Sequence, residues 1–167
     1  MECVHVDIYI YIMASITGHV EVPSSLPPAK VFKVFSDFDN VAPKADPQTI
    51  KSINIIEGDG GVGTIKNYIY GDGKSSKVKV DSIDTSNLSL SYTYFESEAF
   101  VGLIRKITHH ITFILSLDGG SVYKNIFVVI SKPDAKLPED QIDRAKEALK
   151  KTFKTIESYV IAHPKAY

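Results

Sequence analysis

Hydrophobic and polar residues alternate along most of the chain up to residue 130, and this two-residue period predicts β-strands. Short turns rich in glycine, aspartate and asparagine, such as 71–74 and 118–120, separate the later strands. Strands joined by short turns predict a meander in one antiparallel sheet. The predicted strands are 16–22, 50–57, 64–70, 78–83, 88–94, 104–117 and 121–130.

The stretch 88–94 has the most regular alternation. Leu88, Leu90, Tyr92 and Tyr94 share one face, and serine and threonine occupy the other. A strand of this kind is expected to be antiparallel, with its polar face in water.

Helical spacing appears in three places. Pro27 and Pro28 begin a short helix, a second short helix is expected to end before Pro43, and a long amphipathic helix is predicted over 141–162. The apolar stripe along this long helix and the apolar face of the sheet must both be shielded from water. An α+β fold, with a curved antiparallel sheet wrapped around the C-terminal helix, covers both.

The chain has 167 residues, of which 44% are hydrophobic, so we expect a single domain over 13–167. Residues 4–12 alternate like a strand, but 13–15 resemble a second natural start. Residues 1–12 are therefore interpreted as an N-terminal extension that is non-native or disordered, or that pairs with a sheet edge.

A net charge of −1 provides no general attraction to DNA or to anionic membranes. One cysteine excludes an intrachain disulfide. The sequence also lacks an apolar run long enough to span a membrane and the basic segment of a signal peptide. These features predict a cytoplasmic protein.

Four glycines, Gly58, Gly60, Gly61 and Gly63, stand in one short loop. A phosphate-binding loop of the Walker type would place a lysine directly after its last glycine and then begin a helix. Here Lys66 lies three residues beyond Gly63, and a predicted strand follows. The pattern favours a shaped loop over a nucleotide site.

The predicted inner face of the sheet is bulky and unusually polar. It carries Tyr68, Tyr70, Tyr92, Tyr94, His109, Tyr123 and Asn125. Periodicity alone leaves two interpretations open: a ligand pocket with a few polar groups in an apolar wall, or a filled core whose tyrosines reach the rim.

Four segments, in this order, closely resemble the plant pathogenesis-related class 10 proteins, the family of the major birch-pollen allergen. They are NVAPK at 40–44, GDGGVGTIK at 58–66, DGGS at 118–121 and IESYVIAHPKAY at 156–167. The resemblance implies a helix-grip fold with seven strands, two short helices and a large internal cavity. It also implies a monomer without a cofactor that binds cytokinins or other phytohormones, flavonoids or sterols.

By position, the resemblance implies a cavity wall drawn from the sheet, the first short helix and the long helix. The expected wall residues are Phe35, Tyr68, Tyr70, Leu90, Tyr92, Tyr94, Ile107, His109, Ile111, Tyr123, Asn125, Phe127, Ala145, Leu149 and Phe153.

Two enzymatic alternatives follow from the same resemblance, although a binding protein is favoured. Ribonuclease activity on RNA would involve Lys66, Glu157 and Tyr159, but the family's other acidic candidate aligns with Arg105. The alternative interpretation makes Lys66 and Glu157 solvated charges or a weak ion pair. Alkaloid condensation or isomerisation is the second alternative, but Ala99 and Val101 stand near the places where the condensing members carry a tyrosine and an acid.

His109 and His110 are adjacent, so on a strand they point to opposite faces, and parity with Ile107 and Ile111 turns His109 inward. His109 is either a general base or polar ligand contact or a structural histidine bonded to a neighbour. Adjacent strand histidines diverge and no acid or cysteine cluster joins them, so no metal site is expected.

Overall fold

A computed structural model describes residues 14–100 and 102–167, so the predictions for residues 1–12 lie outside the described residues. In this part of the chain, seven strands form one antiparallel sheet in the order β1-β7-β6-β5-β4-β3-β2. Consecutive strands from β2 to β7 are neighbours, as the meander predicted. The strands are β1 (Ser15–Ser24), β2 (Ile50–Glu57), β3 (Ile65–Tyr70), β4 (Ser75–Asp84), β5 (Ser89–Ser97), β6 (Ile104–Leu115) and β7 (Ser121–Ser131).

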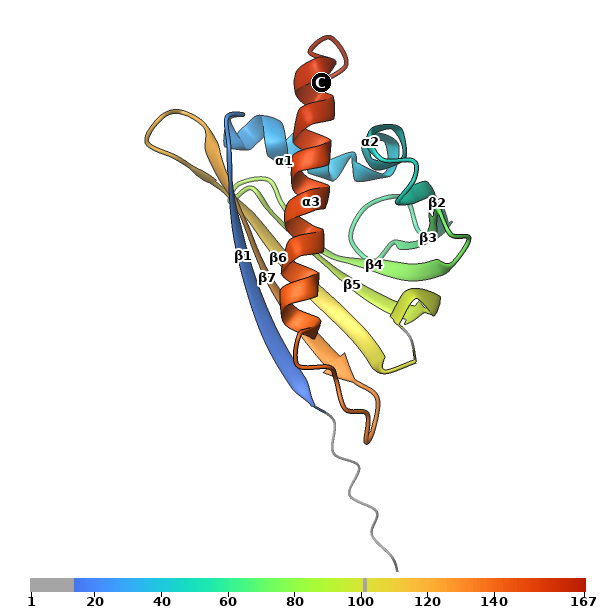
Figure 1. Ribbon diagram of the computed structural model, residues 1–167. Helices are drawn as coiled ribbons and strands as arrows, with labels where there is room; N and C mark the ends of the chain where they lie inside the picture. The colour runs from blue at the N-terminus through green and yellow to red at the C-terminus, as the bar shows by residue number, and fades with distance from the viewer. Residues whose placement is uncertain (1–13, 101) are drawn as a thin grey trace, which may run out of the picture.

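The sheet curves around the long helix α3 (Gln141–Ala162), and α1 (Pro28–Ser36) and α2 (Phe38–Ala45) lie at one end of it (Figure 1). A short 3₁₀ helix, η1 (Glu98–Phe100), follows β5. This arrangement confirms the predicted α+β helix-grip fold.

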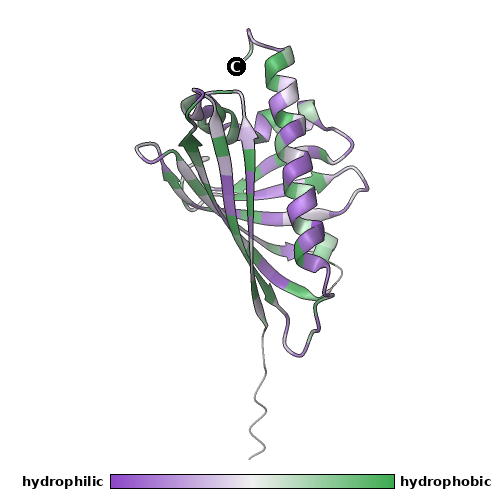
Figure 2. Cartoon of the chain, turned by 60° about the vertical axis from the view of Figure 1, so that its left-hand side comes forward, coloured by the Kyte–Doolittle hydropathy of each residue, from purple (hydrophilic) through white to green (hydrophobic). Residues whose placement is uncertain are grey.

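Alternation along β1 shows how the sequence sets the two faces of the sheet. Val20 and Val22 are buried and their neighbours are exposed, a pattern that is visible as alternating colours along the strands (Figure 2). Gly18 lies opposite Phe127 on β7, and a β-carbon at Gly18 would stand 2.1 Å from the Phe127 ring. The absence of a side chain at Gly18 therefore makes room for Phe127.

The helix α3 buries the apolar stripe that its sequence predicted, most deeply at Phe153, Ile156 and Val160. Closer to its start, Ile142 and Leu149 are only partly buried. Among the described residues, no helix combines the length and the apolar character needed to cross a membrane. The apolar stripe of α3 packs on the sheet and on the short helices.

Two local predictions are wrong. Pro43 lies inside α2, which continues to Ala45, and the amide of Asp46 still donates to the Ala42 carbonyl, so the last turn closes without the missing proline N–H. Ser91 is buried rather than solvated, and its hydroxyl lies in hydrogen-bond contact with the Ser82 hydroxyl. The register between β4 and β5 shifts at Val80 and Ser82, and such an irregularity redirects side chains locally.

Candidate ligand-binding site

A chain of aromatic rings crosses the concave face of the sheet. The rings of Tyr92 and His109 stack with their centroids 5.0 Å apart, and His109 stacks on Phe127 at 5.7 Å. Tyr94 meets Tyr68 edge to face at 5.6 Å. Strands β3, β5, β6 and β7 thus contribute one continuous aromatic surface.

A second group of rings joins this surface to the helices. Tyr123 of β7 stacks on Phe153 of α3 at 4.6 Å, and Phe35 of α1 lies 5.6 Å from Phe153. Phe113 of β6 also contacts Phe35, at 5.3 Å. These contacts fix α1 and α3 over the concave side of the sheet.

The structure places the predicted wall residues in three connected settings. The first is a buried cluster containing Leu90, Ile111, Tyr123 and Phe153, with Phe35, Tyr92 and Leu149 packed against it. The second is a cluster that contains Phe127, against which Ile107, Ala145 and again Leu149 pack. The third is a cluster that contains Val41 and Ala42 of α2, against which Tyr70 packs. Ring contacts and hydrogen bonds attach the remaining residues, Tyr68, Tyr94, His109 and Asn125, to these clusters.

A pocket of about 600 Å³, a figure that includes the open space at its mouth, lies between the α1–α2 junction, the glycine loop and strands β3 to β5. We call it the side pocket. Four predicted wall residues line it: Phe35, Tyr68, Leu90 and Tyr92. The remaining lining residues are Ser36, Phe38, Asp39, Gly60, Lys66, Val78, Val80, Ser82, Ile83 and Ser91.

Sequence reasoning did not assign most of these lining residues to the wall. Val78 and Val80 carried a usable signal, because their two-residue spacing puts both on one face of β4. Phe38 and Asp39 gave none, since they reach the pocket only through the way α2 packs over the sheet.

Tyr68 and Tyr92, which line the pocket, and Tyr94, which contacts both of them, carry phenol hydroxyls. Burial raises the pKa of Tyr68, Tyr92 and Tyr94 well above the ordinary value for tyrosine. Among the described residues no hydrogen-bond partner is found for these hydroxyls, and none of them is a fully buried unpaired atom. Each therefore keeps accessible surface and, at neutral pH, a proton that it can donate.

His109 is buried and His110 is exposed, in agreement with the alternation along β6. Desolvation lowers the pKa of His109 to about 4, so the imidazole is neutral at pH 7. Its Nδ1 lies 3.3 Å from the side-chain oxygen of Asn125, whose amide nitrogen donates to the Tyr123 hydroxyl at 2.7 Å. A neutral imidazole that the Asn125 side chain holds in place is suited to a hydrogen bond with a polar group of a ligand.

Lys66 and Asp39 form an ion pair at the side pocket, with 2.6 Å between Lys66 Nζ and Asp39 Oδ2. The Lys66 side chain is 11% exposed and that of Asp39 is 23% exposed. The interpretation of Lys66 as a solvated surface charge is therefore wrong, because its side chain is buried and paired with Asp39 of α2.

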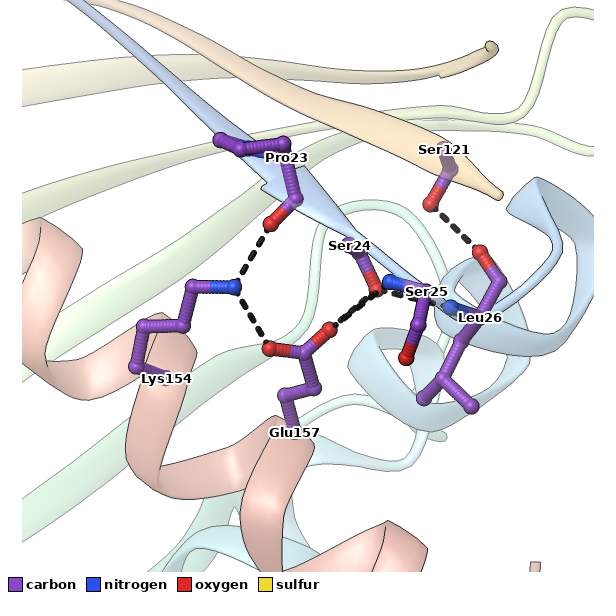
Figure 3. Close-up of polar contacts among 7 residues, drawn as sticks. All are labelled: Pro23, Ser24, Ser25, Leu26, Ser121, Lys154 and Glu157. Carbon is purple, nitrogen blue, oxygen red and sulfur yellow. Dashed lines mark hydrogen bonds and ion pairs between the residues drawn. The ribbon is translucent and has the colours of Figure 1, made fainter. Parts of the chain in front are cut away.

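Glu157 is also buried, at the junction of β1, α1 and α3 (Figure 3). Its carboxylate accepts hydrogen bonds from the Ser24 hydroxyl at 2.6 Å, the Ser25 amide at 3.2 Å and Lys154 Nζ at 2.7 Å. Lys154 also donates to the Pro23 carbonyl at 2.6 Å. This network fastens α3 to the end of β1, so the solvated interpretation fails for Glu157 too.

The bonds to Glu157 also set its charge state. Burial by itself would raise the pKa of Glu157, but the hydrogen bonds from Lys154 and Ser24 outweigh burial and lower the pKa below its usual value. A carboxylate with a lowered pKa and occupied lone pairs is a poor general base.

The three ribonuclease candidates do not form one constellation among the described residues. Lys66 pairs with Asp39, Glu157 with Ser24 and Lys154, and the Tyr159 ring stacks on His163 with centroids 4.2 Å apart. The described residues also contain no group of three or more histidine, cysteine, aspartate or glutamate side chains placed to hold a metal ion.

Three backbone amides of the glycine loop donate hydrogen bonds within the loop or to the adjacent strand. The amide of Gly60 donates to the Thr64 hydroxyl, that of Gly61 to Asp59 and that of Gly63 to the Val80 carbonyl. Gly58, Gly60 and Gly63 all have positive φ angles, which favour glycine. The loop is shaped to border the side pocket, and these amides do not point together at a phosphate.

Comparison with known proteins gives one consistent family. A model of the pathogenesis-related protein Bet v 1 family matches residues 13–163. The "Root allergen protein" of Taraxacum officinale is 57% identical over 150 residues, which cover 87% of this chain and 96% of the relative. The crystal structure of Ara h 8.0201 superposes with a TM-score of 0.79 at 33% identity, covering 89% of this chain and 99% of that one.

A more distant likeness concerns the fold alone. The X-ray structure of norcoclaurine synthase from Thalictrum flavum, in complex with dopamine and hydroxybenzaldehyde, superposes with a TM-score of 0.71 at 19% identity. It covers 90% of this chain and 89% of that one. At this identity the same fold carries different functions, so the likeness says nothing about activity here.

Proposed function

The chain belongs to the pathogenesis-related protein Bet v 1 family, and from this premise we propose that it is a cytoplasmic, monomeric carrier of an amphiphilic small molecule. The proposed ligand classes are cytokinins or other phytohormones, flavonoids and sterols. The ligand would lie between the concave face of the sheet and the helices, entering at the side pocket.

The observation that carries this proposal is the composition of the side pocket. Its wall is mainly apolar, with Phe35, Leu90 and Val78 among the lining residues, and Tyr68 and Tyr92 add hydroxyls. Small-molecule sites in proteins typically combine a mostly apolar wall with a few placed polar groups. Flavonoids, cytokinins and sterols present this same mixture of apolar rings and a few polar groups.

Binding is favoured over catalysis by the surroundings of His109. Its contacts among the described residues are the Asn125 amide and the rings of Tyr92, Tyr94 and Phe127. A general acid/base site needs a second group of matched pKa within reach of the substrate. A neutral imidazole amid aromatic rings is better suited to contact a ligand than to transfer its protons.

Dye displacement tests the proposal. A hydrophobic fluorescent dye is bound to the purified protein and titrated with a panel of cytokinins, flavonoids and sterols, and each mixture is then analysed by mass spectrometry. We expect displacement at micromolar concentrations by at least one class, with every ligand recovered unchanged. A new mass in any mixture would replace the carrier by an enzyme, and a protein that binds neither dye nor ligand would overturn the proposal.

Two variants locate the binding. Val80→Trp fills the side pocket from β4, whereas Ile126→Trp adds the same ring at an exposed position on the opposite face of β7 from Asn125. We expect Val80→Trp to weaken displacement and Ile126→Trp to leave it unchanged. Melting temperatures of both variants show whether a loss of binding reflects loss of the fold.

A further inference from the structure

One carboxylate oxygen at the side pocket has no hydrogen-bond donor. Asp39 Oδ1 is buried and unpaired, the only such side-chain nitrogen or oxygen found in the described part of the chain. The other oxygen of the same carboxylate is held by Lys66 at 2.6 Å. A buried polar atom without a partner is unfavourable, and native proteins keep few of them.

The surroundings of this oxygen belong to the pocket. Asp39, Lys66 and Tyr68 all line it, together with Ser36 on the preceding helix. The Asp39 charge acts on Tyr68 strongly enough to help raise its pKa, although no hydrogen bond joins the two residues. Asp39 is thus part of the pocket wall, and no donor of the wall satisfies its Oδ1.

Little movement is needed to present this oxygen to a ligand. The terminal torsion of an aspartate has a broad energy minimum, so the carboxylate can turn at small cost. Lys66 is attached by a flexible four-carbon stem and can follow the turn while keeping its ion pair.

From this geometry we propose that Asp39 Oδ1 accepts a hydrogen bond from a neutral hydroxyl or N–H group at the polar end of the ligand. The inference rests on the proposed function and specifies the ligand class at the same site. Lys66 already balances the aspartate charge, so the site selects a neutral donor and does not call for a cation. An ether or ketone at the same place would leave the carboxylate oxygen unpaired.

Calorimetry with a matched pair of probes tests this selection. 2-Naphthol carries a donor, and its methyl ether 2-methoxynaphthalene does not. The quantity measured is the ratio of their affinities, compared between protein variants, so that the greater hydrophobicity of the ether cancels. A hydrogen bond to a charged acceptor corresponds to roughly ten- to hundred-fold in affinity, and we expect Asp39→Asn to lower the ratio by at least ten-fold.

The reason lies in the geometry of the substituted amide. Lys66 retains the amide oxygen as its acceptor, and the NH₂ group then takes the place of Oδ1 and donates. Asp72→Asn is the matched control, because it makes the same change in charge at an aspartate that is 56% exposed in the turn after β3. Its affinity ratio should equal that of the wild type.

The outcomes separate the two levels of the argument. Equal affinity ratios in the wild type and both variants would overturn the role of Asp39 while leaving the carrier function intact. The same conclusion would follow if members of the ligand panel displace the dye but 2-naphthol does not bind. If neither naphthalene nor any member of the dye panel binds, the proposed function fails and this inference falls with it.

Two further results bear on the same point. A naphthylmethylammonium cation that binds more tightly than 2-naphthol would overturn the selection for a neutral donor. If Asp39→Asn does not fold, the ¹³C resonance of the Asp39 carboxyl in the wild-type protein decides: 2-naphthol should shift it, and the ether should not. No shift with bound 2-naphthol would overturn the inference.

Discussion

Replacing Glu157 by glutamine separates a structural role of this residue from a catalytic one. Its carboxylate accepts hydrogen bonds from Ser24, Ser25 and Lys154, and the side chain is only 9% exposed. Glutamine keeps one carbonyl oxygen and turns an NH₂ group towards a donor. At least one charge-assisted hydrogen bond is lost, and its net contribution is about 1.5–3 kcal/mol.

The half-exposed Lys154 adds little to this estimate, since exposed ion pairs contribute about 0–1 kcal/mol. We therefore expect Glu157→Gln to destabilise the protein by about 2 kcal/mol, a figure set by the hydrogen bond that is lost. For a chain of this size, that corresponds to a fall in melting temperature of roughly 4–8 °C.

Thermal unfolding followed by circular dichroism measures this fall. Glu147→Gln is the matched control, because Glu147 is 73% exposed on the same helix and, within the described part of the chain, pairs only with Lys150. It should change the melting temperature by about 1–2 °C, because an exposed ion pair within one helix contributes about 0.3–0.5 kcal/mol. Equal melting temperatures for the two variants would refute the structural role, and loss of RNA cleavage at unchanged stability would restore the catalytic one.

The pH dependence gives a second check on Glu157. Its pKa is lower in the folded protein than the ordinary value of 4.5, so the unfolded chain takes up the proton at higher pH. The advantage of the wild type over Glu157→Gln should therefore be complete at pH values above the ordinary pKa of 4.5, where the unfolded chain is also deprotonated. It should shrink as the pH falls through the lowered pKa, and a difference that grows in acid would contradict the assignment.

Three other substitutions test the packing and charges around the site. Gly18→Ala places a β-carbon against the Phe127 ring and should cost about 1–3 kcal/mol, measured by urea unfolding; an unchanged midpoint would contradict the close contact. Burial lowers the pKa of His109 from 6.5 to about 4, so wild-type stability should fall by up to about 3 kcal/mol as the pH drops through that window. His109→Phe should remove this part of the slope, which unfolding at pH 7 and pH 4.5 detects, and an unaltered slope would refute the shift. Lys66→Met leaves the Asp39 carboxylate without its cation and should cost about 3 kcal/mol, the lower end for a broken buried ion pair. In a double-mutant cycle with Asp39→Asn the losses should be less than additive; strictly additive losses would show that the pair is not coupled.

Elements whose hydrophobic pattern repeats over many residues, and turns with characteristic residues, could be predicted from the sequence. The helix over Gln141–Ala162 matches its predicted bounds, because its apolar stripe repeats over six turns. The turn at 71–74 was equally clear, since its glycines permit the backbone angles that a tight turn requires.

Features that depend on packing between distant elements could not be predicted. Glu157 is polar, so periodicity gives no sign that Ser24 and Lys154 surround it. The burial of Ser91 follows from a register shift that strict alternation does not contain. Asp39 reaches the side pocket through the packing of α2 over β2, which the pattern of hydrophobic residues does not contain.

Selective ¹³C labelling of tyrosine rings tests the central claim, ligand binding inside the concave face, most directly. The account predicts saturable shifts for Tyr68, Tyr92 and Tyr94 on adding a ligand that displaces the dye, because their rings line or adjoin the side pocket. Tyr159 and Tyr167, which contact each other near the end of the chain, serve as internal controls and should not move. Shifts confined to Tyr159 and Tyr167, or no tyrosine shift at saturating ligand, would contradict the account.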